Sequence, residues 1–248
     1  MLTTNSRSEW FISWFDTRYY QMLYRDRDHH EAERFLQRLL LTLDPAAGSK
    51  ILDLACGVGR HSIFLNKQGF HVTGVDASVN SIAKAAAFRT ESLHFAVHDM
   101  REPYADQSYD FVFNLFTSFG YFEDPSDDLR VLQAVYKALK PRGRFVFDFF
   151  NAEKVRATLV SSETKVVDDI VFSIEREISG GFVIKTIRFV DAGESFVFQE
   201  KVRLLSTEDI QSYFAQAGFK VANAYGNYAM QPFAAESSDR LIFIAEKV

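Results

Sequence analysis

The stretch Ile51-Leu-Asp-Leu-Ala-Cys-Gly-Val-Gly-Arg60, followed by Gly74-Val-Asp76, decides the fold of this chain. An apolar strand ends at Asp53, a glycine-rich turn follows at Gly57 and Gly59, and a helix then begins. A second apolar strand ends at another acid. This order predicts a βαβ unit of the nucleotide-binding kind, in which the acid after the second strand can accept hydrogen bonds from a ribose diol.

The spacing of the glycines argues against a dinucleotide ligand. A dinucleotide fingerprint has the form G-x-G-x-x-G, but Ser62 stands at the third position, where glycine lets the helix pack closely beneath a pyrophosphate. Asp53 suits a cationic amino acid end instead, directly or through a bound water. The pattern D-L-A-C-G-V-G, with an acid after the second strand, resembles motifs I and II of the class I S-adenosylmethionine-dependent methyltransferases. The alternative is that Gly57 and Gly59 only turn the chain between strand and helix.

The segments around this stretch alternate between strands and helices. Strands are expected near 50–54, 71–76, 93–97, 109–114 and 143–149, and helices at about 60–68, 79–89 and 125–139. A helix over 207–217 and strands near 219–225 and 240–246 follow further along, and the last two strands are expected to form a hairpin. Such alternation predicts an α/β fold with a doubly wound, seven-stranded, mostly parallel sheet. This layout resembles the Rossmann-like methyltransferase fold.

Two segments stand outside that alternation. In residues 165–205 apolar side chains recur at every second position between glycine-containing turns, which predicts an inserted three-stranded antiparallel β meander with one buried face. The N-terminal 45 residues contain two helical patterns, which either pack on the sheet edge or cover the cofactor. We therefore divide the chain into an N-terminal helical lid (1–45), a Rossmann-like methyltransferase domain (46–160 and 206–248) and a β insertion (161–205). The insertion would serve as a substrate cap or an oligomer contact.

Composition narrows the classes of partner. The chain has 248 residues, 47% of them hydrophobic, and a net charge of −5 that provides no positive field for a nucleic acid backbone. Its single cysteine, Cys56, excludes an internal disulfide and is expected to be a small packing residue. The sequence has no signal-peptide pattern and no apolar run near about 18 residues. We expect a cytoplasmic protein without membrane, nucleic acid or metal partners, and a homodimer is compatible with the sequence.

The candidate site residues follow the strand ends, because ligands in such sheets bind where the strand order reverses. The first strand contributes Asp53, Gly57, Gly59 and Arg60. Here the glycines would let the backbone approach the ligand, and the helix N-terminus would favour its carboxylate. The second strand contributes Asp76, whose carboxylate can accept hydrogen bonds from both ribose hydroxyls, and Asp76 could alternatively cap the next helix.

The remaining cofactor contacts are what the resemblance implies. Asp99 would accept a hydrogen bond from the adenine amino group, and Met100 would pack on the ring. Asp99 could instead belong to a surface loop, and Met100 to the core. The backbone at Asn114 and Phe116 would pass the methionyl end of the ligand. Two further contacts are implied, at Ala77 and Tyr24.

The resemblance further implies the function: methyl transfer from S-adenosyl-L-methionine to a small-molecule acceptor, by in-line attack on the sulfonium methyl. Positioning and desolvation can supply most of the acceleration, so a base is needed only if the nucleophile enters protonated. The base candidates, of which we assign none, are His61, Tyr20, Tyr24 and Tyr121.

The acceptor is less sharply defined. The run Tyr19-Tyr-x-x-Leu-Tyr24, together with the meander, is similar to methyltransferases acting on small amines, amino sugars or natural products. No Asn-Pro-Pro-Tyr follows the fourth strand and no Pro-Cys occurs, which disfavours DNA bases, whereas a protein acceptor stays open. Two other functions are weighed against a methyltransferase. One is a non-catalytic S-adenosylmethionine or S-adenosylhomocysteine binder, and the other is a nicotinamide-dependent oxidoreductase, which needs the missing third glycine.

Overall fold

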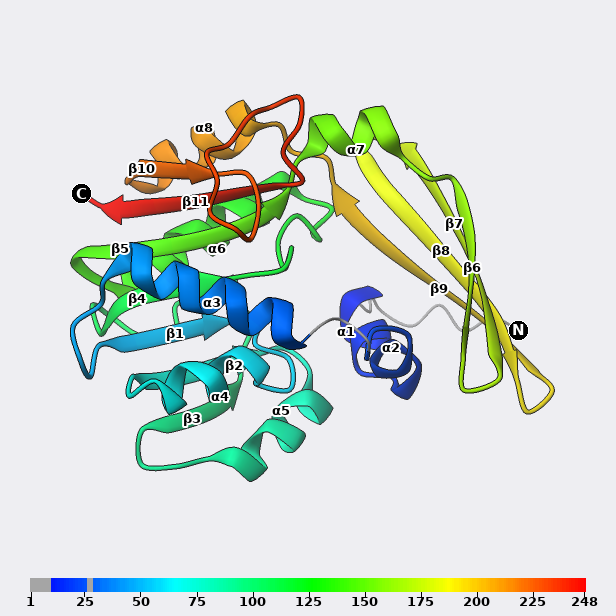
Figure 1. The fold of residues 1–248 in the computed structure, drawn as a ribbon, viewed down its shortest axis with the longest axis horizontal. Helices are drawn as coiled ribbons and strands as arrows, with labels where there is room; N and C mark the ends of the chain where they lie inside the picture. The colour runs from blue at the N-terminus through cyan, green and yellow to red at the C-terminus, as the bar shows by residue number, and fades with distance from the viewer. Residues whose placement is uncertain (1–9, 26–28) are drawn as a thin grey trace.

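The computed structural model describes residues 10–25 and 29–248, and it contains two β-sheets (Figure 1). The larger sheet has seven strands in the order β10-β11-β5-β4-β1-β2-β3. Strands β1 to β5 are parallel, and β11 is antiparallel to both β5 and β10. The strands are β1 (Lys50–Leu54), β2 (His71–Asp76), β3 (Leu93–Val97), β4 (Tyr109–Asn114), β5 (Leu139–Phe150), β10 (Phe219–Tyr225) and β11 (Arg240–Lys247). This arrangement confirms the predicted doubly wound sheet, with its reversal of strand order between β1 and β4.

Helices cover both faces of this sheet. The helices α6 (Pro125–Ala138) and α8 (Thr207–Ala217) pack on one face, and α3 (His29–Leu43), α4 (Arg60–Lys67) and α5 (Val79–Ala85) pack on the other. A short 3-10 helix, η1 (Ala86–Phe88), extends α5. Caps bound two of these helices: at the start of α6 the Asp124 side chain accepts from Ser126 N–H, and Gly218 ends α8 in the left-handed conformation.

The second sheet corrects the predicted meander. It has four antiparallel strands, β6 (Ser162–Val167), β7 (Ile170–Ser179), β8 (Phe182–Asp191) and β9 (Glu194–Arg203), where three were expected. The missed strand, β6, is a mostly exposed edge strand without apolar alternation. The turn that joins it to β7 is formed by Asp168 and Asp169, both at positive φ, as in a type I′ hairpin. A short helix, α7 (Ala152–Thr158), leads from β5 to this sheet and was also missed.

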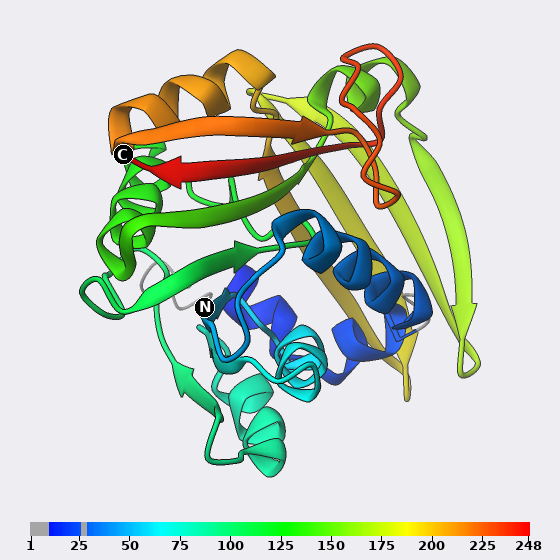
Figure 2. The same ribbon diagram turned by 60° about the vertical axis from the view of Figure 1, so that its left-hand side comes forward.

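Two short helices lie between the sheets (Figure 1 and Figure 2). The first of the two helical patterns expected in residues 1–45 is in fact two helices, α1 (Trp10–Phe15) and α2 (Arg18–Leu23). The break occurs because the Thr17 side chain accepts from Tyr20 N–H and starts a new helix. Trp14, Tyr19 and Leu23 of these helices pack on the inner face of the four-stranded sheet. In contrast, α3 belongs to the core of the larger sheet, so the N-terminal helices are not one structural pair.

Asp16 joins α1 and α2 to the seven-stranded sheet. Its carboxylate accepts hydrogen bonds from Ser78 Oγ (2.5 Å) and from Asn80 Nδ2 (2.6 Å), at the N-terminus of α5, the helix that follows β2. The two helices therefore bridge both sheets. No helix in the described part of the chain is long and apolar enough to cross a membrane.

Candidate active site

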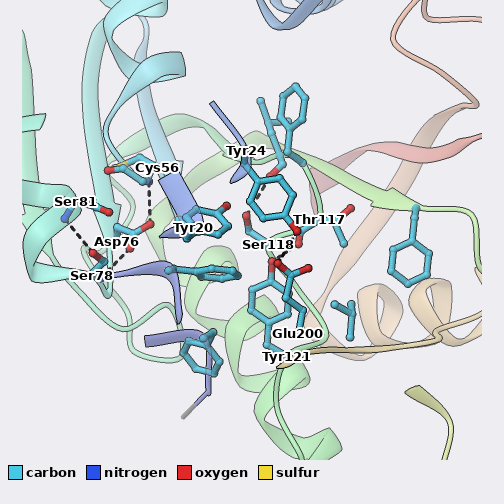
Figure 3. Close-up of a pocket in the computed structure, with 18 of the residues that line it drawn as sticks. Tyr20, Tyr24, Cys56, Asp76, Ser78, Ser81, Thr117, Ser118, Tyr121 and Glu200 are labelled. Atoms are coloured by element: carbon cyan, nitrogen blue, oxygen red, sulfur yellow. Dashed lines mark hydrogen bonds between the residues drawn. The ribbon is translucent and has the colours of Figure 1, made fainter. Parts of the chain in front are cut away.

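A cavity of about 990 Å³ lies between the carboxyl ends of the parallel strands and the inner face of the four-stranded sheet. Helices α1 and α2 form part of its wall. Figure 3 shows Asp76, Ser78 and Cys56 at one side of this cavity and Tyr24, Thr117, Tyr121 and Glu200 at the other, with Tyr20 between them. Most of the predicted site residues line it: Tyr24, Asp53, Gly57, Arg60, Asp76, Ala77, Asp99, Met100 and Phe116.

Asp76 is held at the end of β2 by backbone donors. Gly57 N–H donates to Asp76 Oδ2 and Ser78 N–H donates to Oδ1, both at 2.8 Å. Burial raises the pKa of Asp76, against the opposing effect of these two hydrogen bonds. The alternative that Asp76 caps the next helix is wrong, because the Ser78 side chain caps α5. Asp76 therefore presents to the cavity a carboxylate of fixed orientation.

Asp53 is more deeply buried than the sequence suggested. Its side chain is 2% exposed, and Ser62 Oγ donates to Asp53 Oδ2 at 2.6 Å. Burial raises the pKa of Asp53 to about 7, although the Ser62 hydrogen bond opposes the shift. Ser62, which departs from the dinucleotide pattern, thus holds the acid at the end of β1. The neighbouring Cys56 is buried as predicted, and burial raises the pKa of its thiol.

The two glycines of the turn have different roles. Both have positive φ, 56° at Gly57 and 81° at Gly59. A Cβ on Gly57 would meet nothing within 4 Å, whereas a Cβ on Gly59 would lie 2.6 Å from the ring of Phe95. Gly59 does not line the cavity, so the expectation that both glycines admit the ligand fits only Gly57. Gly59 lets α4 pack on β3.

The loop after β4 passes through the centre of the cavity wall. Phe116 and Thr117 have φ values of 59° and 63°, a conformation that costs about 1–3 kcal/mol for each non-glycine residue. Asn114 does not line the cavity. It is fully buried and its Nδ2 donates to Leu54 O (3.2 Å) and Ser118 O (3.3 Å), so that it ties β1 to this loop.

A buried ion pair on β5 and β11, which the sequence did not reveal, holds the loop in place. Asp148 Oδ2 accepts from Phe116 N–H at 2.7 Å, and Oδ1 accepts from Arg240 Nε at 2.8 Å. Arg240 Nη2 also donates to Thr117 Oγ1 at 2.8 Å. Burial raises the pKa of Asp148 against the opposing charge of Arg240. These contacts fix the two strained residues.

Asp99 and Met100 lie at the end of β3. Arg101 Nη2 donates to Asp99 Oδ2 at 2.5 Å, and Arg101 also bonds Asp127 on α6. Burial would raise the pKa of Asp99, but the hydrogen bonds and charge of Arg101 outweigh it and hold the pKa below its usual range. Asp99 therefore stays an ionised acceptor at the cavity, and Met100 packs beside it against the core.

Aromatic side chains enclose the middle of the cavity. His61 stacks on Phe116 with ring centroids 4.9 Å apart, and the Arg60 guanidinium lies 5.4 Å from the same ring. Tyr121 OH donates to Thr117 O, and Tyr24 OH donates to Glu200 Oε1 at 2.6 Å. All four base candidates named from the sequence line the cavity, and none is singled out by these contacts.

The cavity wall on the four-stranded sheet carries charged residues that sequence reasoning missed. Arg176, Lys185 and Glu200 line the cavity from β7, β8 and β9. The signal was present in the sequence, because each interrupts a series of apolar residues at alternate positions, as in Phe196-x-Phe198-x-Glu200-x-Val202.

Comparison with known proteins gives related sequences over most of the chain. Residues 24–224 match the sequence model of a methyltransferase domain. YqeM of Bacillus subtilis (strain 168), which is named as a methyltransferase, is 29% identical over 208 residues, covering 80% of this chain and 84% of the relative. The cypemycin N-terminal methyltransferase of a Streptomyces species is 27% identical over 209 residues, covering 81% and 84%.

Solved structures share the fold at lower identity. An S-adenosylmethionine-dependent methyltransferase from Clostridium acetobutylicum ATCC 824 superposes with a TM-score of 0.77 at 22% identity, over 92% of this chain and 95% of that one. CalS10, an amino pentose methyltransferase from Micromonospora echinaspora solved with S-adenosylmethionine bound, gives a TM-score of 0.72 at 19% identity, over 94% and 98%. At these identities the likeness establishes the fold.

Proposed function

Because the chain belongs to the S-adenosylmethionine-dependent methyltransferases, we propose that it methylates a small-molecule acceptor held between its two sheets. One observation carries the proposal. A single cavity of about 990 Å³ joins the strand ends, where Asp76 lies, to the charged wall of the four-stranded sheet. This volume lies at the upper end of the range of about 300–1,000 Å³ that is usual for ligand pockets, so the cavity has room for a cofactor and a small acceptor side by side.

The residues at the strand ends fit the cofactor. The Asp76 carboxylate accepts hydrogen bonds from two backbone N–H groups. Because a carboxylate has about four acceptor sites, it can still accept hydrogen bonds from the ribose hydroxyls. The open space at Gly57 lets a ligand approach the backbone, and the N-terminus of α4 beside Arg60 favours a carboxylate. Asp99 and Met100 would hold the adenine end. When bound, S-adenosylmethionine supplies a methyl group made electrophilic by the sulfonium.

The chain's own contribution is to position the reactants and to exclude water. The aromatic residues that enclose the cavity reduce the local dielectric, which favours a reaction that disperses charge. The strained loop at Phe116 and Thr117 is fixed from beneath by Asp148, so the wall between the two ends of the cavity is rigid. We assign no general base.

The nature of the acceptor is supported by chemistry and by relatives. One relative is named for methylation at an N terminus, and one structural neighbour is named for an amino pentose. The net charge of −5 supports an acceptor other than nucleic acid. The segment 161–205 supplies one wall of the cavity, which favours the substrate-cap role over an oligomer contact. The division into lid, methyltransferase domain and insertion, a homodimeric state and a cytoplasmic location stay predictions.

Calorimetry and a turnover assay test the proposed function. We expect S-adenosylhomocysteine to bind and to raise the unfolding temperature, whereas NAD does neither. We also expect methyl transfer from S-adenosylmethionine to one or more members of a panel of amines and phenols, and mass spectrometry detects the methylated product. Absence of S-adenosylhomocysteine binding would contradict the cofactor site. Binding without transfer to any acceptor would favour the non-catalytic binder.

A further inference from the structure

Three charged residues form a row across the inner face of the four-stranded sheet. In the strand register, Arg176 of β7 lies opposite Lys185 of β8, and Lys185 lies opposite Glu200 of β9. The inner-face positions next along these strands are apolar, and Ile174 and Ile187 are buried under α1 and α2. The row begins where that apolar packing ends and the cavity starts.

Glu200 is the best anchored member of the row. Its Oε1 accepts from Trp14 Nε1 at 2.8 Å and from Tyr24 OH at 2.6 Å. Lys185 Nζ donates to the same Tyr24 hydroxyl and lies 3.5 Å from Glu200 Oε2. Among the described residues, this 3.5 Å contact with Lys185 is the shortest polar contact of Glu200 Oε2. It is long, because a strong charge-assisted hydrogen bond measures about 2.7–2.9 Å. One carboxylate oxygen is thus fixed and the other is weakly bonded at the cavity.

Stability alone does not account for this row. The side chains of Lys185 and Glu200 are only 15% and 16% exposed, and that of Arg176, paired with Glu163, is 20% exposed. Ion pairs so far from solvent lose much of their Coulomb energy to desolvation, and apolar residues of similar size are often at least as stable. Apolar residues at the three positions of the row would pack beside Val183 and Val202, which line the same wall. Charges kept at such a position indicate a ligand.

The charge of the cavity indicates the sign of that ligand. Among the described residues, the acids that line it are Glu31, Asp53, Asp76, Asp99, Glu163 and Glu200. The lining cations are Arg25, Arg60, Arg176, Lys185 and Arg240. Two of these cations, Arg25 and Arg240, are bonded to acids outside the lining, namely Asp168 and Asp148, and one of the acids, Asp99, is bonded to Arg101, which also lies outside the lining. The acids that remain outnumber the remaining cations, so the lining as a whole favours cations over anions, while in the row itself Glu163 and Glu200 balance Arg176 and Lys185.

We propose that the row Arg176–Lys185–Glu200 is the acceptor-binding surface, and that Glu200 Oε2 binds a protonated amino group of the acceptor. This proposal rests on the proposed function. The bound amino group is not the atom that is methylated, because a protonated nitrogen has no lone pair for attack. The acceptor therefore carries an ammonium group in addition to its nucleophile, and Tyr24 and Trp14 hold the carboxylate that recognises it.

Matched pairs of acceptors test this recognition. Tyramine and 4-ethylphenol share a phenol nucleophile, and 1,4-diaminobutane and butylamine share an amine, but only the first of each pair keeps an ammonium group beside the nucleophile. We expect the wild-type protein to prefer the first member by about tenfold or more in kcat/KM, expressed mainly in KM. Glu200→Gln should lose this preference and still bind S-adenosylhomocysteine with unchanged affinity.

The matched control lies next to Glu200 on the same strand. Gln199 points to the outer face, where its Nε2 donates to Thr186 Oγ1, so Gln199→Ala should keep the wild-type preference. Three results would overturn the proposal. The Glu200→Gln variant could keep the wild-type preference, the wild-type protein could show no preference, or it could methylate none of the four acceptors. Transfer to other acceptors would then leave the proposed function standing. Binding of S-adenosylhomocysteine without any transfer would contradict the proposed function as well.

Discussion

Substitution of the two turn glycines by alanine separates packing from ligand access. In Gly59→Ala the new Cβ would lie 2.6 Å and 2.7 Å from two ring atoms of Phe95 and 3.3 Å from Ala85 Cβ. Because φ at this position is 81°, the left-handed conformation adds about 1–2 kcal/mol, and overpacking of the core adds about 1–3 kcal/mol. The free energy of unfolding should therefore fall by about 2–5 kcal/mol. Gly57→Ala has the strain but no clash, so its loss should be about 1–2 kcal/mol.

Urea unfolding followed by tryptophan fluorescence measures these losses. A second substitution, Phe95→Leu, removes the ring atoms that the new Cβ would meet. In the double-mutant cycle the clash should appear as a coupling of about 1–3 kcal/mol between positions 59 and 95. Gly57→Ala with Phe95→Leu is the control and should show no coupling.

Two results would refute this reasoning. Equal losses for Gly57→Ala and Gly59→Ala would mean that Phe95 yields without cost. Absence of coupling with Phe95→Leu would place the loss entirely in backbone strain. A separate measurement concerns the ligand. Gly57→Val should abolish S-adenosylhomocysteine binding in a folded protein, because this glycine lines the cavity. An unfolded Gly57→Val variant would mean that Gly57 is structural.

Three further predictions concern the buried acids. Asp76→Ala should weaken S-adenosylhomocysteine binding by about 1–3 kcal/mol in calorimetry, and unchanged affinity would contradict the ribose role. The pKa of Asp53 is raised in the folded protein from 3.8 to about 7, so the folded state binds more protons than the unfolded state between these values. Asp53 therefore stabilises the fold at low pH and loses this contribution as the pH rises from 3.8 to about 7, and Asp53→Asn should flatten the fall in urea stability between about pH 4 and 7. Asp148→Asn should cost about 3–5 kcal/mol in the same urea assay, because it leaves the buried Arg240 charge without its partner. Thr117→Val, which removes a hydroxyl and leaves the ion pair intact, should cost less.

The sequence was sufficient for the parts of the fold that rest on hydrophobic periodicity. Strands such as β1 and β4 are buried on both faces and read as short apolar runs, so their bounds were predicted to the residue. The edge strand β6 has mostly exposed, polar positions, and its hairpin turn is Asp-Asp where glycine or asparagine would be the clearer signal. The break between α1 and α2 depends on a single threonine cap. Features that depend on one cap or one turn do not change the hydrophobic periodicity, so periodicity did not predict them.

The candidate site was predictable where neighbours in the sequence are neighbours in space. Asp53, Gly57 and Arg60 come from one strand and turn, and Asp76 follows the adjacent strand, so the order of strands was enough to bring them together. Asp148 and Arg240 are 92 residues apart, and their pairing depends on the insertion of β11 next to β5. Gly59 follows β1 and Asn114 ends β4, but Gly59 lies against Phe95 and the Asn114 side chain bonds Leu54 O and Ser118 O, so neither lines the cavity.

For the row Arg176–Lys185–Glu200, the periodicity of the sequence contains information about a binding surface as well as about the fold. Period two fixes the side of a strand on which a residue lies, so Arg176 and Glu200 were already placed on the inner face by the apolar residues that precede them. An inward charge next to buried apolar neighbours needs a partner, and here each finds one across the sheet or on an adjacent helix. The partners explain how the charges are tolerated. Only their place at the edge of the packed region, facing the same cavity as Asp76, connects them to a second ligand, and that connection required the arrangement of α1 and α2 between the two sheets.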